Sequence, residues 1–501
     1  MQSRLDKFRQ DRRNEDATDG GRLPRIRGGF EVPLSCLSRM ALAALQESLT
    51  ITPRSTYDRA QVPDAIQCYR LTGTRIIVPR AFGWERFPSS RFEDDRSPGQ
   101  PLPTCEFQGE LKAQQLEAFR RSCEALSREP RVCMLTMPCG FGKTVVALRI
   151  ALEVGKRTLV VVHKEFLLAQ WRNRIAQFLP TLRVTILQGS KSVDPDADVV
   201  LAMLQTLCLR LPDEASATVG IVSQCGLAIV DEAHHMAARS FGELFFHLPV
   251  AAVLGLTATP KRKDGCTSIL HMHMGGHAFL LEDSEAPRER PTVRFVTYSS
   301  PGRTARDLSA GETQRLKTEI TKDEMRNRII CETCLRLAGE GRQIICLSDR
   351  IAHLTALLRS FEEATKGELA ASLYVGGQKK EARERAEKDC AVLFGTFAMA
   401  QEGLDVPRLD TLILASPASD ITQAVGRILR PCAEKNAPLI VDIQDDACQQ
   451  FTRQNQSRRR FYTKHGILPE GEPRPSSLLH CAPPAVPPSP KRRRTQLLEG
   501  F

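Results

Sequence analysis

RVCMLTMPCGFGKTVVALRIALEV, residues 131–154, joins an apolar run to an Ala- and Leu-rich run through a short turn. The first seven residues predict a buried strand, and the last ten predict a helix. Gly140 and Gly142 let the N–H groups of the turn curl around phosphate oxygens, and the helix N-terminus adds the positive end of its dipole. The sequence therefore predicts a phosphate-binding loop.

The side chains of this loop fit a nucleoside triphosphate. Lys143 would reach the β- and γ-phosphates, and the Thr144 hydroxyl would bind Mg²⁺. The full consensus has a glycine where this chain has Met137. GxGKT alone is also compatible with a chance turn, but the strand before it and the helix after it favour ATP binding. The candidate nucleotide-binding residues are Pro138, Cys139, Gly140, Phe141, Gly142, Lys143 and Thr144.

A second candidate element is the apolar run LAIV at 227–230, which is followed by Asp231, Glu232, Ala233 and His234. An ATPase site needs a carboxylate at the end of a neighbouring buried strand. Asp231 would hold Mg²⁺ through water, and Glu232 would polarise the attacking water. The alternative is a strand that simply ends in solvated acids. Its position downstream of GxGKT favours the ATPase interpretation.

The pattern along the chain predicts an α/β fold. Apolar β-branched runs alternate with helical periods twice over, which indicates two parallel sheets covered by helices on both faces. We expect lobes at 105–282 and 291–465, joined by a linker at 283–290. Residues 28–104 suggest a small mixed accessory domain. Residues 1–27 and the Pro-rich, basic tail 466–501 are expected to be disordered.

Charge indicates a class of partner. The 501 residues carry 70 Lys and Arg against 59 Asp and Glu, a net charge of +11. A basic chain attracts polyanions, and nucleic acid comes first among them. Charge alone is equally compatible with an enzyme that merely happens to be basic.

Seven motifs in order across residues 105–465 resemble those of the superfamily 2 helicases. The resemblance implies two RecA-like lobes that bind ATP in their cleft, with Gln115 reading adenine and Gly403 and Asp405 contacting the nucleotide. The segments that carry it, beyond the two above, are LKAQQ (111–115), VVHK (161–164), MLQT (203–206), TAT (257–259), ICLSDR (345–350), GT with QEGLD (395–396 and 401–405) and QAVGRILR (423–430).

The last motif supplies catalytic candidates from the second lobe, namely Gln423, Arg427 and Arg430. An arginine that reaches the γ-phosphate across a cleft contributes roughly 10³–10⁵ in rate. Arg427 and Arg430 lie three apart on an expected helix, so we expect both to point into the cleft. Hydrolysis would then depend on lobe closure, which couples ATP to motion.

Within this superfamily, the chain looks most like the XPB-like branch and its relatives in large DNA viruses, including the poxvirus transcript-release helicase. The segments that carry this likeness are DEAHH (231–235), GLTATPKRKDG (255–265) and MAQEGLDVP (399–407). The resemblance implies an ATP- and Mg²⁺-dependent DNA helicase or translocase, with DNA favoured over RNA and transcription or replication machinery as further partners. The alternatives are an RNA-directed ATPase and a non-motor nucleic-acid scaffold.

Two basic runs bear on partners and location. Arg453, Arg458, Arg459, Arg460 and Lys464 accompany Phe461 and Tyr462, which suits phosphate contact with base stacking or, equally, a solvated helix face. PKRRR at 490–494 resembles a nuclear-import signal or an electrostatic tail. The N-terminus lacks the apolar core of a secretory signal, and the apolar runs fall short of a membrane span. We therefore expect the 16 cysteines to be free thiols, and a nuclear or viral replication-site location.

Overall fold

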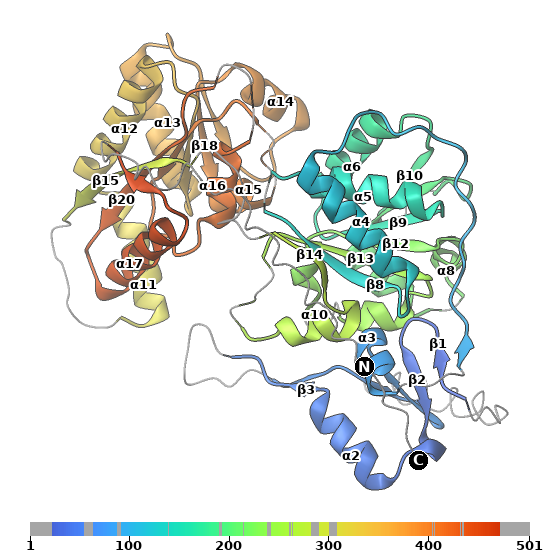
Figure 1. Cartoon of the computed structure of the whole chain (residues 1–501). Coiled ribbons are helices and arrows are strands. Elements are labelled where there is room, and N and C mark those ends of the chain that lie inside the picture. Colours follow the sequence, from blue (N-terminus) through green and yellow to red (C-terminus); the bar gives the residue numbers. More distant parts are fainter. Residues whose placement is uncertain are drawn as a thin grey trace, which may run out of the picture.

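The structure is a computed structural model of the chain. It describes residues 23–470 except for 55–63, 88–91, 139, 190–192, 214, 238–241, 260–261, 263, 282–289, 300–307, 403, 405, 431 and 433–434. Most of the predicted arm and tail, and the site candidates Cys139, Gly403 and Asp405, lie outside the described residues. Figure 1 shows the described part as two α/β lobes and a smaller N-terminal domain beneath the first lobe.

The first lobe is built on a seven-stranded sheet in which every neighbouring pair is parallel. Its central strands are apolar and buried along their whole length, as expected for strands covered on both faces. The spatial order is β10-β11-β9-β12-β13-β8-β14. The strands are β8 (Val132–Thr136), β9 (Thr158–Val162), β10 (Val184–Leu187), β11 (Val199–Met203), β12 (Leu227–Val230), β13 (Ala252–Thr257) and β14 (His277–Leu280).

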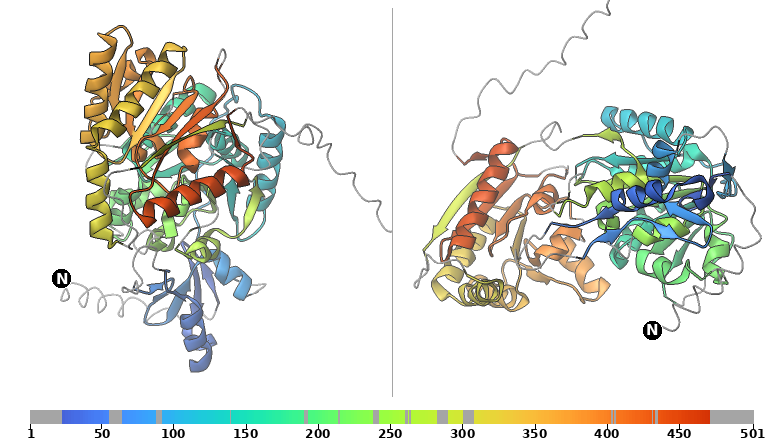
Figure 2. Two further views of the ribbon diagram at one scale, coloured as in Figure 1. Left: turned by 90° about the vertical axis from the view of Figure 1, so that its left-hand side faces the viewer. Right: turned by 90° about the horizontal axis from the view of Figure 1, so that it is seen from below.

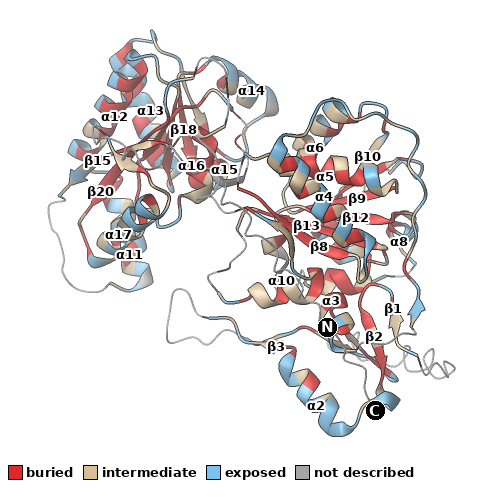
Figure 3. Ribbon diagram, viewed as in Figure 1, coloured by how far each residue is buried: buried red, intermediate tan, exposed pale blue. Residues whose placement is uncertain are grey.

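Helices cover both faces of this sheet and form two separate cores (Figure 3). One face packs against α4 (Ala113–Ser127), α5 (Lys143–Val154) and α6 (Glu165–Phe178). The other face packs against α7 (Leu204–Arg210), α8 (Ala217–Val222) and α10 (Thr267–Met274). Two short 3-10 turns, η3 (Ala233–Ala237) and η4 (Glu243–His247), follow β12.

The second lobe repeats the same topology. If the strands of each lobe are numbered 1 to 7 along the chain, both sheets have the spatial order 3-4-2-5-6-1-7. All pairs in the second sheet are again parallel. Its strands are β15 (Thr292–Tyr298), β16 (Ile344–Ser348), β17 (Ala371–Tyr374), β18 (Val392–Thr396), β19 (Thr411–Leu414), β20 (Leu439–Asp445) and β21 (Leu468–Pro469).

Seven helices belong to the described part of this lobe. They are α11 (Ala310–Ile320), α12 (Glu324–Gly339), α13 (Ile351–Thr365), α14 (Lys380–Asp389), α15 (Phe397–Glu402), α16 (Thr422–Ile428) and α17 (Gln449–Lys464). The predicted fold class, two parallel-sheet α/β lobes in tandem with a small N-terminal domain, is confirmed by this architecture.

The N-terminal domain shares a core with the first lobe. Its helix α3 (Arg80–Arg86) packs on α10, and the buried Arg80 guanidinium donates to the carbonyls of Arg27, Leu248 and Ala251. Figure 2 shows α2 projecting away from this interface. The remaining elements are β1 (Arg25–Ile26), β2 (Phe30–Pro33), η2 (Leu34–Cys36), α2 (Arg39–Ser48), β3 (Thr50–Ile51), β4 (Ile66–Gln67), β5 (Arg70–Leu71), β6 (Arg75–Val78) and β7 (Glu93–Asp94).

None of the helices in the described ranges has both the length and the apolar character that crossing a bilayer requires.

Candidate active site

The glycine loop lies where the sequence predicts it, between β8 and α5. Gly140 and Gly142 have φ angles of +78° and +83°, in the left-handed region that glycine adopts without strain. A Cβ atom on Gly142 would lie 2.5 Å from the Gln115 side-chain nitrogen. Helix α5 begins at Lys143, so its free N–H groups open toward the loop. The loop therefore has the backbone shape that cradling phosphate requires.

Gln115 holds this loop from the first turn of α4. Its Nε2 atom donates to the Phe141 carbonyl at 2.8 Å, and its Oε1 atom accepts from the Lys112 N–H at 2.9 Å. A glutamine amide has two N–H donors and two acceptor lone pairs. One donor and one acceptor therefore remain for a ligand, which is what reading an adenine edge needs.

Asp231 is a half-buried carboxylate at the end of β12. Its Oδ2 atom accepts from the Trp171 indole N–H at 2.8 Å, and its Oδ1 atom accepts from the Glu232 N–H at 3.0 Å. Burial, followed by the neighbouring charge of Glu232, raises the pKa of Asp231 to about 6, while Trp171 and Lys143 oppose that shift. Within the described residues no arginine or lysine forms an ion pair with Asp231. A half-buried carboxylate that no described arginine or lysine pairs with suits a bound metal cation.

Glu232 is held in a strained conformation. Its φ angle is +47°, which is uncommon for a residue with a side chain and occurs mostly at functional sites. Its Oε2 atom is buried and forms no hydrogen bond within the described residues, although His234 Nδ1 lies 3.4 Å away. Burial lowers the pKa of His234 to about 3, so this imidazole is neutral. One oxygen of the Glu232 carboxylate therefore lies beside a neutral imidazole, and the residue lines the cleft described below.

The histidine of the DEAH sequence connects this strand end to the next one. His234 Nδ1 lies 3.2 Å from the Thr257 hydroxyl, which also bonds both the N–H and the carbonyl of Thr259. This contact connects the DEAH sequence at 231–234 to the TAT segment at 257–259.

The second lobe faces these groups across a cleft of about 450 Å³. Gln423 and Arg427 lie on α16, and Arg430 follows its end. A Cβ atom on Gly140 would lie 3.5 Å from Arg430 Cγ, so the Arg430 stem lies against the glycine loop. The residues that line the cleft include Gly140, Gly142, Lys143, Thr144, Trp171, Asp231, Glu232, Gln423, Arg427 and Arg430.

Both arginines line the cleft, as expected, but Arg427 is in addition bonded within its own lobe. Its Nε atom donates to the Ala400 carbonyl at 2.7 Å, and its Nη1 atom donates to the Leu404 carbonyl at 2.9 Å. The Arg427 side chain thus links α16 to the end of α15. Sequence spacing could not show this, because both carbonyls lie more than 20 residues earlier in the chain.

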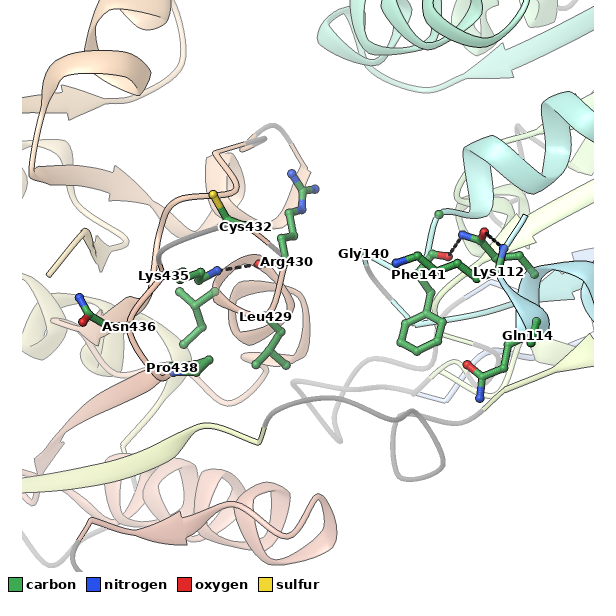
Figure 4. A pocket seen from close by; sticks show the side chains of 14 residues that line it. Lys112, Gln114, Gly140, Phe141, Leu429, Arg430, Cys432, Lys435, Asn436 and Pro438 are labelled. Atoms are coloured by element: carbon green, nitrogen blue, oxygen red, sulfur yellow. Dashed lines mark hydrogen bonds between the residues drawn. The ribbon is translucent and has the colours of Figure 1, made fainter. Parts of the chain in front are cut away.

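A wider cleft of about 710 Å³ continues from the first (Figure 4). Phe141 and Gln114 lie on one side of it, and Leu429, Lys435, Asn436 and Pro438 lie on the other. An apolar ring and a leucine beside amide groups suit a nucleobase. The sequence did not predict Cys432, Lys435, Asn436 and Pro438 in this cleft, or Trp171 in the first one. They have no motif spacing that would identify them.

The basic run on α17 is not a single surface. Arg458 is fully buried in an ion pair with Asp442, so the prediction that it contacts phosphate is wrong. Arg459 lies over the Phe295 ring at 4.5 Å and bonds Gln444. Arg460 and Lys464 are exposed and remain candidates for phosphate contact.

Comparison with known proteins agrees with this geometry. Residues 108–262 match the family model described as type III restriction enzyme, res subunit (ResIII). A protein of Acanthamoeba polyphaga mimivirus named as an ATP-dependent RNA helicase is 28% identical over 451 residues, covering 87% of this chain and 84% of the relative. A helicase of Invertebrate iridescent virus 6 is 26% identical over 387 residues, covering 73% and 84%.

Among solved structures, the ATP-dependent Type ISP restriction-modification enzyme LlaBIII bound to DNA matches with a TM-score of 0.46 and 18% identity, over 66% of this chain and 27% of that one. The sequence matches confirm the predicted likeness and the predicted enzyme class. Residues 108–262 carry a ResIII domain, and over most of its length the chain is similar to viral proteins named as helicases.

Proposed function

We propose that the chain is an Mg²⁺-dependent ATPase that couples hydrolysis to movement along nucleic acid, with DNA as the favoured strand. The observation that carries this proposal is the cleft itself. A glycine loop, a half-buried carboxylate with no ion-pair partner among the described residues and a strained glutamate line the cleft from one lobe, and Arg430 lines it from the other.

Each residue has a defined task in this proposal. Lys143 holds the β- and γ-phosphates, and Gln115 reads the adenine edge beside Phe141. Thr144 and Asp231 hold Mg²⁺, which supplies charge neutralisation on the phosphates when it is bound. Cys139, Pro138, Gly403 and Asp405 complete the nucleotide contacts. Residues 139, 403 and 405 lie outside the described part of the chain.

The proton leaves the attacking water toward Glu232. Glu232 lines the cleft, and its strained backbone conformation fixes the direction of its carboxylate. Arg430 supplies positive charge where negative charge develops in the transition state, with Gln423 beside it. Because these groups come from different lobes, hydrolysis requires closure and product release permits opening.

RNA is the second candidate strand, because the mimivirus relative is named as an RNA helicase. The net charge of +11 serves either polymer. A non-motor scaffold is disfavoured, because it would have no use for a carboxylate such as Asp231, whose pKa is raised to about 6 by burial. We further propose action beside transcription, repair or replication machinery in the nucleus or at a viral replication site. The basic run at 490–494 that suggests nuclear entry lies outside the described residues.

The test is an ATPase assay of the full chain with single-stranded DNA, duplex DNA and RNA side by side. Stronger stimulation by DNA supports the proposal, and stronger stimulation by RNA transfers it to the second candidate. No turnover with any polymer, with binding retained, would leave the scaffold as the correct description.

A further inference from the structure

We propose that Trp171 is a positioning residue that fixes the metal-binding carboxylate of Asp231 and connects it to the nucleic-acid segment of the first lobe. This inference rests on the proposed function, since it assigns the residue that prepares that site.

The contact is specific and buried. Trp171 is 1% exposed, and its indole N–H donates to Asp231 Oδ2 at 2.8 Å. Indole has one donor and no acceptor, so this bond is the only conventional hydrogen bond that the side chain can make. The Glu232 N–H fixes the second oxygen at 3.0 Å. Two donors at opposite oxygens define the plane of the carboxylate.

A neutral donor suits this task better than a charged one. An arginine would form an ion pair with the carboxylate and neutralise the negative charge that attracts a metal cation. An indole N–H stabilises and orients the ionised carboxylate without cancelling its charge. Groups that orient metal ligands in this way typically change metal affinity 10–100-fold when they are removed.

Helix α6 joins Trp171 to the VVHK segment at 161–164. The helix begins at Glu165, directly after this segment. The His163 carbonyl accepts from Gln205 Nε2 at 3.1 Å, and Gln205 belongs to the MLQT segment at 203–206, which resembles a nucleic-acid-contact segment of the helicases. The His163 ring also lies 4.1 Å from that of His235 beside Glu232.

Trp171 lies seven residues beyond Lys164, about 10 Å along the helix axis at 1.5 Å per residue. Over that distance an α-helix moves as a rigid element. A displacement of the 161–164 segment by a bound strand is therefore passed to the indole ring, and from there to the Asp231 carboxylate.

The experiment compares Trp171→Phe with Trp84→Phe in the full chain. Phenylalanine keeps an apolar ring and removes the N–H. Trp84 is the second of the two tryptophans and lies on α3 of the N-terminal domain, so it is the matched control. We expect Trp171→Phe to need on the order of tenfold more Mg²⁺ for half-maximal ATPase, and Trp84→Phe to match the wild type. An unchanged Mg²⁺ requirement in Trp171→Phe would overturn the positioning role.

A second readout needs neither turnover nor the Trp171→Phe variant. In Trp84→Phe, Trp171 is the only tryptophan, so its emission reports on its surroundings. Single-stranded DNA without nucleotide should change that emission, and Mg²⁺ with ADP should change it further. Constant emission on strand addition, with binding confirmed by anisotropy of a labelled strand, would overturn the connection through α6. If wild type and Trp84→Phe bind no nucleotide and show no turnover, the proposed function itself fails.

Discussion

The two lobes have the same strand order but differ in the partners of the acidic residues on their strands. In the second lobe, Asp442 and Asp445 on β20 are both 0% exposed, and each is paired with an arginine. Arg458 lies 2.8 Å from Asp442, and Arg326 lies 2.6 Å from Asp445. In the first lobe, Asp231 is half-buried at a strand end, and the hydrogen bonds that it accepts from the described residues come from neutral donors.

This difference separates structural acids from a functional one. An acid buried with its own arginine is neutralised inside the protein and has no charge left for a ligand. An acid buried without such a partner costs folding free energy unless a cation arrives. The raised pKa of Asp231 is the sign of that cost. Because both lobes have the same topology, the difference in their chemistry comes from individual residues at the strand ends.

The largest expected effect comes from removing the cation of the glycine loop. Lys143→Ala should reduce hydrolysis to background, because no other lysine is proposed to reach the β- and γ-phosphates. The melting temperature should stay close to that of the wild type, since Lys143 is half-buried at the first position of α5 and its ammonium bonds the Met137 carbonyl instead of packing in the core. Lys322→Ala, an exposed lysine after α11, is the control. Unchanged turnover in Lys143→Ala would refute the ATP site.

The second-largest expected effect comes from breaking the buried ion pair between Asp442 and Arg458 in the second lobe. Asp442→Asn leaves Arg458 buried without its carboxylate and weakens the bond from the Tyr462 hydroxyl at 2.9 Å. Breaking a buried pair in this way costs about 3–5 kcal/mol. Urea unfolding monitored by circular dichroism measures the loss, with the exposed Glu363→Gln as control. A loss below about 1 kcal/mol would show that Asp442 is not structural.

Replacing Asp231 with Asn in the first lobe should increase the free energy of unfolding, whereas Asp442→Asn decreases it. The pKa of Asp231 is raised in the folded state, so ionisation of this group costs stability. That cost is absent below about pH 4, grows as the pH rises to about 6 and is complete above it. Asp231→Asn should therefore stabilise the metal-free protein by on the order of 1–3 kcal/mol at pH 8 and by little at pH 4.

This prediction is checked by melting the variant and the wild type in EDTA across that pH range. Activity should be lost while stability rises, as happens where a functional site costs stability. A destabilised Asp231→Asn at pH 8 would show that Asp231 is a structural acid like Asp442.

The sequence predicted the strands and the glycine loop well because both depend on neighbouring residues. Apolar runs such as LAIV form buried strands, and glycines permit the left-handed turn. The short edge strands β14 and β21 were missed, since their sequences HAFL and LP show no strong pattern. Gln115 was found through its motif, but its bond to the Phe141 carbonyl was not.

Contacts between distant segments could not be predicted. Three consecutive arginines at 458–460 look alike in the sequence, yet only Arg458 meets Asp442, which lies 16 residues earlier. Trp171 and Asp231 are 60 residues apart. No spacing rule links such pairs, because the sheet order brings them together.

The smallest expected effect concerns the exposed end of α17. If Arg460 and Lys464 contact phosphates, replacing each with Ala should flatten the log–log salt dependence of strand binding by up to ~0.9. Arg359→Ala on the exposed face of α13 is the control. A slope equal to that of the control would identify this surface as a solvated face or a protein contact.

The central claim is that the two lobes form one catalytic site, and Arg430 tests it most directly. In Arg430→Ala, nucleic-acid-stimulated ATPase should fall by on the order of 10³, because the arginine acts on charge that develops in the transition state. The affinity for a single strand should stay within a few fold of the wild type. Loss of strand binding with basal hydrolysis intact would instead make Arg430 a phosphate-backbone contact and contradict the shared site.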